Sequence, residues 1–265
     1  KGGTAYDLPV AVGIMQGMNI VKEEATKNVL VIGELGLNGE VRPVSGILPI
    51  VMEAAKHGVR RCILPKENEQ EAAVVKEIDV YGVSCIGEVV SFFKSPVNPS
   101  FTKTIVDAQK MLGNNKKYGE DFEDIQGQEM IRRGAEIAAA GFHHMLLVGP
   151  PGSGKTMIAK RIPSILPLMS LEESLEVSTI YSVAGLLGEK HSLITVRPFL
   201  NPHHTITSRA LTGGGYIPKP GVISLAHRGV LFLDELPEFK KEALEILRQP
   251  LEDRKVQIAR KGGTF

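Results

Sequence analysis

Hydrophobic and polar positions alternate regularly over the first third of the chain. Apolar residues at helical spacing predict helices at 7–18, 47–57, 67–78 and 88–93, and short apolar runs predict strands at 28–32, 62–64 and 80–86. In the first helix, Val10, Ile14 and Met18 share one face. Asn38-Gly39, just after the first strand, indicates a hairpin turn. Helices and strands in this order predict a compact α/β unit.

The last part of the chain carries two short apolar runs, at 145–148 and 229–233, which predict buried strands. Ser170 and Glu173 have the spacing of a capping box, and Pro163 is expected to shorten or kink the helix that contains it. The predicted helices are 129–140, with Met130, Ile131, Ala135 and Ala138 at helical spacing, then 155–162, 170–183 and 240–248. Residues 255–260 predict a strand that enters a turn at Gly262-Gly263.

Two stretches lack long apolar patterns. Residues 96–120 contain Pro, Asn and Gly clusters that are typical of a linker, with room for one short helix near residues 105–111. Residues 186–228 contain so many helix and strand breakers that they indicate an insertion on the second unit. The pattern therefore predicts domains at 1–95 and 121–265 with a linker between them.

Composition and charge restrict the function classes. With 265 residues, 43% hydrophobic and 23% charged, the chain can bury the core of one large or two medium domains. The net charge of +1 requires no nucleic acid or membrane partner, so any basic surface must be local. Cys62 and Cys85 form no C-x-x-C or Cys/His pattern, which argues against a disulfide framework or structural zinc and favours the reducing cytoplasm.

The ends of the chain also carry information. No apolar run approaches the roughly 20 residues that span a bilayer, so no membrane association is predicted. The first residues, KGGTAYD, resemble neither a signal peptide nor an initiator start, and we expect the chain to begin inside a larger protein.

A phosphate-binding loop follows the apolar run at 145–148. Residues 149–156, GPPGSGKT, satisfy G-x-x-x-x-G-K-[ST] between a predicted strand and a predicted helix. Backbone N–H groups of such a loop face one point, to which the helix adds the positive end of its dipole. Lys155 is expected to reach the β and γ phosphates of ATP, and Thr156 to complete the shell of Mg²⁺. The predicted nucleotide contacts are Gly149, Pro150, Pro151, Gly152, Ser153, Gly154, Lys155 and Thr156.

Two adjacent carboxylates follow the apolar run at 229–233, where open α/β sheets place their ligand chemistry. We expect Asp234 to hold the water shell of Mg²⁺ and Glu235 to polarise the attacking water. An Asp-Glu pair is usually just solvated, but in a chain with a phosphate-binding loop it supports nucleotide hydrolysis. Glu235 and Lys155 are therefore the predicted catalytic residues.

Basic and histidine side chains are interspersed with Gly and Pro in the predicted insertion. We expect this loop to face a phosphate backbone through Arg197, His203, His204 and Arg209, with Tyr216 and Lys219 nearby. The alternative, a metal site at His203-His204, is disfavoured because adjacent histidines point in different directions and no carboxylate cluster accompanies them.

The first third of the chain resembles a known family. The strings DLPVAVGI and GELGLNGEVRPVSGILPIVMEAAKHGVRRCILPKEN are similar to the proteolytic domain of Lon-type proteases, which has the ribosomal S5 domain 2-like fold. This resemblance places Val10 and Leu48 at the positions of the family's catalytic serine and lysine. Neither residue supplies a nucleophile or a base, so the resemblance implies the fold without peptidase activity, and both residues are expected in an apolar helix core.

The combination GPPGSGKT, NPHHTITSRALTGGG, PKPGVISLAHRGVLFLDELPEF and VQIARKGG resembles the Mg-chelatase-like ComM/YifB family of bacterial AAA+ proteins. The resemblance implies a Lon-like α/β domain followed by a P-loop NTPase (AAA+) α/β/α core, with Asp124 and Ile125 against adenine. It also implies a hexameric ATPase, with ComM members acting as DNA helicases in branch migration. The family's sensor, arginine finger and lid are expected beyond residue 265.

Two other functions remain open at this point. One is a magnesium-chelatase-type subunit that uses the same ATPase to insert metal into a porphyrin, which the Lon-like domain argues against. The other is an ATP-dependent protease, which Val10 and Leu48 argue against.

Overall fold

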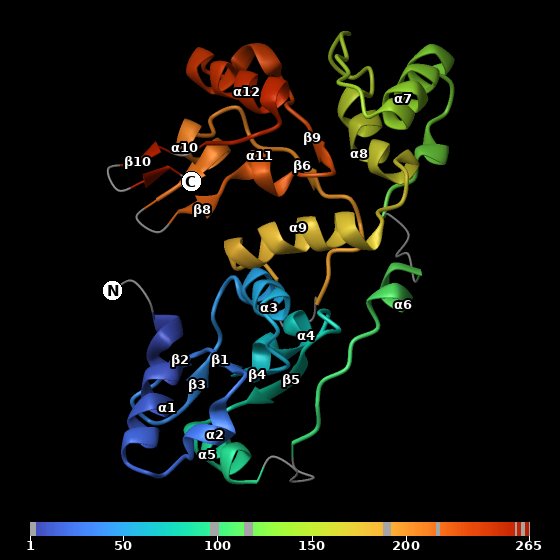
Figure 1. Cartoon of the computed structure of the whole chain (residues 1–265). Coiled ribbons are helices and arrows are strands. Elements are labelled where there is room, and N and C mark those ends of the chain that lie inside the picture. Colours follow the sequence, from blue (N-terminus) through green and yellow to red (C-terminus); the bar gives the residue numbers. More distant parts are fainter. Residues whose placement is uncertain are drawn as a thin grey trace. The chain divides into compact units, whose positions relative to one another are not determined.

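The computed structural model describes residues 4–95, 101–113, 119–187, 192–215, 218–257, 259–260 and 263–264. Contacts divide the chain into two compact units (Figure 1). Unit 1 comprises Lys1–Lys110 and Ser178–Leu193, and unit 2 comprises Met111–Val177 and Ile194–Phe265. The helix α9, Leu171–Ala184, contributes its first half to unit 2 and its second half to unit 1. The sequence instead placed all of 178–193 in the second domain.

Unit 1 is built on a parallel sheet with the strand order β1-β4-β5 (Figure 1). Its strands are β1 Val29–Val31, β4 Arg61–Pro65 and β5 Asp79–Val83, paired with Leu30 opposite Cys62 and Cys62 opposite Val80. A hairpin joins β2 Glu34–Leu35 to β3 Val41–Arg42. The helical segments are η1 Thr4–Tyr6, α1 Asp7–Gly17, α2 Glu23–Thr26, α3 Ile47–Lys56, η2 Lys66–Asn68, α4 Glu69–Ala72 and α5 Ile86–Lys94; α6 Ala108–Gly113 crosses the boundary between units.

The predicted hairpin at Asn38-Gly39 is confirmed. Gly39 adopts a φ of 81°, which is strained for residues with a Cβ, and the Asn38 side chain accepts a hydrogen bond from the Glu40 N–H. The predicted helix at 67–78 is shorter than expected. It becomes a 3₁₀ turn and one α-helical turn, after which the Val75 N–H donates to the carbonyl of Ala72, three residues back.

The core of unit 1 uses the opposite face of α1 from the one the sequence suggested. Leu8 and Val12 are buried against the sheet and α5, whereas Val10, Ile14 and Met18 are 59–65% exposed. Because α1 is apolar on almost every side, its pattern does not indicate which face is buried. At the positions that resemble the Lon dyad, Val10 is thus exposed and Leu48 is fully buried.

A buried carboxylate connects three elements of unit 1. Glu71 accepts hydrogen bonds from the Leu48 N–H at 3.0 Å, from the Ser182 hydroxyl and from the Asn68 amide at 3.4 Å. The Leu48 N–H is one of the free donors at the start of α3, so Glu71 caps that helix from outside. The Gly46 N–H also donates to the carbonyl of Ser182. These bonds attach the end of α9 to α3, which explains why residues after 177 belong to unit 1.

Unit 2 contains a two-stranded parallel sheet in which β6 Phe199–Leu200 pairs with β9 Val230–Leu231 (Figure 1). Two short antiparallel pairs are formed by β7 Gly213–Gly214 with β8 Lys219–Pro220 and by β10 Ala259–Arg260 with β11 Gly263–Thr264. The remaining segments are η3 Phe122–Asp124, α7 Glu129–Gly141, α8 Lys155–Ile165, α10 Ser208–Thr212, α11 Val222–Leu225, η4 Leu236–Glu238 and α12 Lys241–Asp253. No helix among the described residues is long and apolar enough to cross a membrane.

Several sequence predictions for unit 2 need correction. Residues 145–148 are not a strand, and Leu146 and Val148 are 73% and 86% exposed, because no strand in the described residues pairs with them. Of the run 229–233, only two residues are assigned to a strand. Helix α8 continues through Pro163 and ends just before Leu166, which the following Pro167 holds in an extended conformation. In α7, Ala135 is buried as expected but Met130 is 90% exposed.

The carboxyl group of Glu71 makes the stability of unit 1 depend on pH. Burial raises the pKa of Glu71. A carboxyl with a raised pKa in the folded chain stabilises the fold when protonated, and this stabilisation is lost as the pH rises through the raised value. Glu71→Gln does not titrate. We therefore expect its free energy of unfolding to gain on the wild type as the pH rises above about 4.5, the ordinary pKa of a glutamate, measured by urea unfolding followed by circular dichroism.

Glu53→Gln is the matched control for this experiment. Glu53 lies exposed on α3, where hydrogen bonding to Lys56 lowers its pKa, so its contribution changes with pH in the opposite direction. A pH-independent difference between Glu71→Gln and the wild type would contradict the prediction.

Candidate nucleotide and magnesium site

Glycines shape the loop that precedes α8. Gly152 and Gly154 have φ angles of 77° and 81°, in the left-handed region that residues with a Cβ rarely adopt. Gly154 is the N-cap of α8, so the free N–H groups of the first helical turn lie next to the loop. The Gln128 side chain donates to the Ser153 carbonyl at 3.3 Å and ties the loop to the start of α7. This loop has the backbone form that an anion-binding site needs.

The ammonium group of Lys155 lies over this loop. Its Nζ donates to the carbonyl oxygens of Gly149 and Pro150, both at 2.9 Å, and is 3.5 Å from the Ser153 hydroxyl. The positive charge is thus held within the loop rather than extended into solvent. Lys155 can therefore compensate the charge of an anion that binds to the loop backbone.

The first turn of α8 meets the residue that follows β9. The hydroxyl of Thr156 donates to Asp234 Oδ2 at 2.8 Å, although 78 residues separate the two in sequence. A hydroxyl and a carboxylate are the oxygen ligands that suit Mg²⁺, which commonly keeps several waters and needs few protein ligands. The described residues contain no cluster of three or more His, Cys, Asp or Glu side chains that could hold a metal. The pair therefore fits Mg²⁺ better than a metal that requires a full protein shell.

Glu235 follows Asp234 in a strained backbone conformation. Its φ of 52° is unusual for a residue with a Cβ, and such strain is often found at functional sites. Its N–H donates to Asp234 Oδ1 at 3.1 Å, and its carboxylate is exposed. The side chain is thus accessible to water next to the Thr156–Asp234 pair.

His204 lies beside this carboxylate, which the sequence did not predict. Its Nδ1 is 3.6 Å from Glu235 Oε2, and its ring contacts that of His203 in a tilted arrangement, with the centroids 4.0 Å apart and the planes at 35°. The register of the sheet pairs Leu200 with Leu231, and each of the two residues stands four positions after its strand's paired leucine. The signal that could have revealed this contact is the short apolar run Phe199-Leu200, which lies between Pro198 and Pro202 and is too short to indicate a strand.

Comparison with known proteins now identifies the family. The family model for magnesium chelatase, subunit ChlI, matches residues 121–265, and the model for subunit ChlI of Mg-chelatase matches residues 1–68. The chain belongs to the Mg-chelatase-like ComM/YifB family. This membership indicates an AAA+ ATPase with an α/β fold.

The relatives in this family match the chain over almost its full length. It is 44% identical to an uncharacterised protein of Mycobacterium tuberculosis over 99% of the chain and 51% of the relative. It is 40% identical to competence protein ComM of Haemophilus influenzae and 39% identical to YifB of Escherichia coli, in each case over 98% of the chain and 50% of the relative. The chain thus spans about half the length of these relatives.

A shorter match has a different name. DNA repair protein RadA of Listeria monocytogenes is 42% identical over 86 residues, which are 32% of the chain and 18% of the relative.

Asp124 and Ile125 are the two residues that the family resemblance placed against adenine. In the structure both make other contacts. The Ile125 side chain is 1% exposed and packs with Phe122, Ala135 and Ile158. Asp124 forms a capping box with Asp121 and lies 3.6 Å from Arg161 Nε. Ile125 therefore belongs to the core, where its side chain does not face a base.

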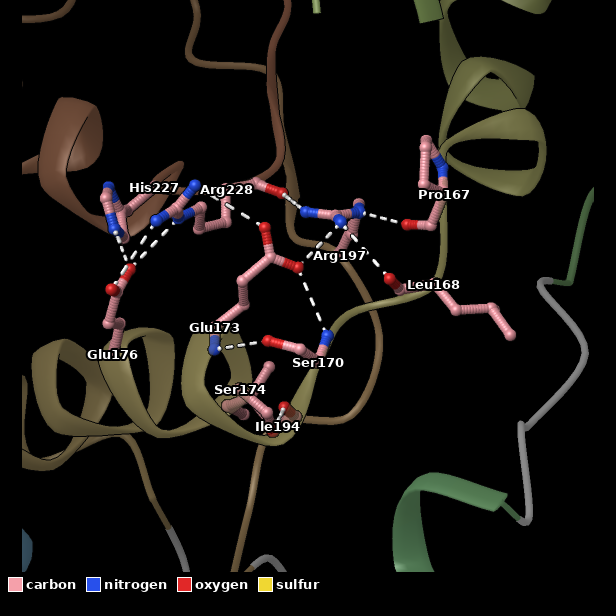
Figure 2. A network of polar contacts seen from close by, with 10 residues as sticks. All are labelled: Pro167, Leu168, Ser170, Glu173, Ser174, Glu176, Ile194, Arg197, His227 and Arg228. Carbon is pink, nitrogen blue, oxygen red and sulfur yellow. Dashed lines mark hydrogen bonds and ion pairs between the residues drawn. The ribbon is translucent and has the colours of Figure 1, made fainter. Parts of the chain in front are cut away.

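The four residues expected to contact DNA differ in their surroundings. Arg209 on α10 and His203 are exposed, and His204 contacts Glu235. Arg197, in contrast, is buried and makes hydrogen bonds to main-chain carbonyls and Glu173 (Figure 2). A guanidinium in that position does not face a phosphate backbone, which corrects the expectation for Arg197. Tyr216 lies outside the described residues, and Lys219 is exposed.

The conformation of the loop predicts opposite effects for two glycine substitutions in unit 2. Gly154→Ala forces a Cβ into the left-handed region, and we expect it to destabilise unit 2 by about 1–2 kcal/mol. Gly134→Ala is the control, since Gly134 lies inside α7 and an added Cβ makes only ordinary contact with Met145. It should stabilise by about 0.5–1 kcal/mol. Urea unfolding measures both, and equal effects would contradict the assigned loop geometry.

Proposed function

We propose that the protein is a Mg²⁺-dependent ATPase of the AAA+ type that moves DNA, acting in the cytoplasm as a homo-oligomer, with a hexamer as the expected form. The observation that best supports ATPase activity is the hydrogen bond between Thr156 and Asp234. It lies beside the loop whose carbonyls hold the Lys155 ammonium group. Membership of the ComM/YifB family supports the same chemistry.

Each residue of the site has a defined part in this mechanism. The loop N–H groups and Lys155 bind the β and γ phosphates, while Thr156 and Asp234 hold the metal. Bound Mg²⁺, held by Thr156 and Asp234, would supply positive charge that neutralises the charge developing on the phosphate during hydrolysis. Glu235, exposed next to Asp234, orients a water molecule for attack.

The DNA part of the proposal depends on fewer observations. His203 and Arg209 are exposed on the segment that follows β6, and Lys219 is exposed on β8. Relatives named as a competence protein and as a DNA repair protein support a nucleic acid partner. A few exposed cationic side chains suit contacts with phosphates, which are independent of base sequence.

A magnesium-chelatase-type activity is the second candidate, because the family model that matches residues 121–265 is that of subunit ChlI. The two functions differ in their stimulating ligand. Stimulation of the ATPase of the full-length protein by DNA supports the motor, whereas stimulation by a porphyrin and its partner subunits supports the chelatase.

Two substitutions separate nucleotide binding from hydrolysis in the full-length protein. Lys155→Ala should abolish ATP binding, because the loop loses its compensating charge, whereas Glu235→Gln should retain Mg²⁺-ATP binding and reduce turnover at least about 100-fold. Affinity is measured with a fluorescent ATP analogue and turnover by phosphate release. Lys160→Ala, on the exposed side of α8, and Glu238→Gln are the controls and should leave both unchanged. Normal turnover in Glu235→Gln would contradict its role.

Arg209 tests the DNA contact. Arg209→Ala in the full-length protein should weaken binding to DNA duplexes of different sequence to a similar extent and reduce the slope of log affinity against log salt by about 1. Fluorescence anisotropy at several salt concentrations measures both quantities. Arg248→Ala, which removes an exposed arginine of α12 that pairs with Glu252, is the control and should have no effect. An unchanged slope in Arg209→Ala would exclude Arg209 from the contact.

A further inference from the structure

Arg197 is the most deeply buried cation for which the structure gives contacts in unit 2. Its side chain is 2% exposed and its Nη2 is 3.0 Å from Glu173 Oε2. Its guanidinium also donates hydrogen bonds to the main-chain carbonyls of Pro167, Leu168 and Arg228 (Figure 2). A buried guanidinium with these acceptors fixes the positions of the segments that supply them.

The segments around Arg197 are the ends of the elements that form the nucleotide site. Pro167 and Leu168 follow α8, the helix that begins with Lys155 and Thr156. Arg228 stands two residues before β9, the strand that leads to Asp234, and Arg197 stands two residues before β6. The Arg197 guanidinium also lies over the ring of Phe142, 5.1 Å from its centroid, at the end of α7 and before the phosphate-binding loop. The Arg197 side chain thus contacts the segment before the phosphate-binding loop, the segment after α8 and the segment that precedes β9.

Glu173 extends this connection to α9. Its Oε2 also accepts the Ser170 N–H at 3.2 Å, which completes the capping box, and its Oε1 is 3.4 Å from Arg228 Nη1. Arg228 in turn pairs with Glu176 at 2.9 Å, and His227 contacts the same carboxylate at 3.0 Å. The first turns of α9 therefore hold the entrances of both strands of the β6–β9 sheet (Figure 2).

The arrangement has a consequence at the other ends of α8 and β9, where Thr156 and Asp234 meet. A helix is stiff, and α8 with its 11 residues is about 16 Å long, so fixing its last turn restricts where its first turn lies. The entrance of β9 is fixed by the same guanidinium. A shift between the two elements would separate the Thr156 hydroxyl from the Asp234 carboxylate, whereas the glycine loop and Lys155 interact within one continuous segment.

We propose that Arg197 is a positioning residue for the metal end of the nucleotide site, acting with Glu173 to hold Thr156 and Asp234 together. This inference rests on the proposed ATPase function. In this role Arg197 sets the geometry of Mg²⁺ binding. The increase in nucleotide affinity that Mg²⁺ provides depends on this side chain, whereas nucleotide affinity without Mg²⁺ does not.

The test compares nucleotide binding by the full-length protein in EDTA and in Mg²⁺. In Arg197→Lys, a single ammonium group cannot reproduce the several directed hydrogen bonds of the guanidinium. In Glu173→Gln, the side-chain oxygen can still cap α9 but the negative charge is lost. For both variants we expect affinity for a fluorescent ATP analogue in EDTA within twofold of the wild type. The factor by which Mg²⁺ increases that affinity should be at least about tenfold smaller than in the wild type. Electron paramagnetic resonance with Mn²⁺ measures metal binding independently.

The controls separate positioning from general stability. Arg161→Lys alters a different ion-paired arginine, which lies on α8 and contacts Glu120 and Asp124 instead of the segments that precede β6 and β9. This variant should retain the Mg²⁺ effect. Thr156→Ala should lose it. Circular dichroism checks folding, and Glu173→Gln, the milder change, keeps the test decisive if Arg197→Lys does not fold.

Two results would overturn the inference while leaving the proposed function intact. One is an unchanged Mg²⁺ effect in folded variants, and the other is an equal loss of affinity in EDTA and in Mg²⁺, which indicates a structural role only. A wild-type protein that binds no nucleotide under either condition would overturn both.

Discussion

Unit 2 depends on the hydrogen bonding of one buried cation. Moving a charge out of water is costly unless it is paired and hydrogen-bonded, and Arg197 meets this condition with the Glu173 carboxylate and three main-chain carbonyls. Those carbonyls belong to residues 167, 168 and 228, so distant parts of the chain meet at one group. Since the guanidinium is planar and its donors point in fixed directions, none of these segments can shift without leaving a buried donor unsatisfied. The rigid part of the site therefore lies away from the exposed loop.

Unit 1 buries the opposite charge in a different way. Glu71 accepts hydrogen bonds from neutral donors: a hydroxyl, an amide and the N–H of Leu48 at the start of α3, where the helix dipole favours a negative charge. This difference matters for how each unit responds to pH. Burial raises the pKa of Glu71, so the charge in unit 1 changes at a higher pH than that of an ordinary glutamate, whereas a guanidinium group stays protonated in proteins.

The sequence predicted local features better than distant ones. The capping box of Ser170 and Glu173 and the Asn38-Gly39 turn depend on neighbouring residues, and both are present. The loop glycines and the nearness of Thr156 to Asp234 also agree with the phosphate-binding motif. Residues 145–148 show the limit, since an apolar run becomes a strand only beside a partner, which the run does not specify.

Arg197 shows why part of the site could not be predicted. Its main acceptors are backbone carbonyls, which every residue carries, so no pattern of side chains marks the position as buried. An arginine among glycines and prolines instead suggested a solvent-exposed contact. The predicted buried face of α1 was wrong for a related reason. A helix that is apolar on all sides carries no pattern that indicates its buried face, so the rest of the fold determines which face is buried.

The contact between His204 and Glu235 follows from strand register. The pair is partly exposed, and ion pairs of this kind add little to stability, so mutual attraction does not explain why the side chains meet. Leu200 and Leu231 are paired in a parallel sheet, and residues that follow paired positions by the same number of steps emerge at the same edge. A change in the segment after β6 that leaves the sheet intact therefore alters what Glu235 faces. Two short strands thus bring the segment expected to meet DNA next to the carboxylate expected to orient water.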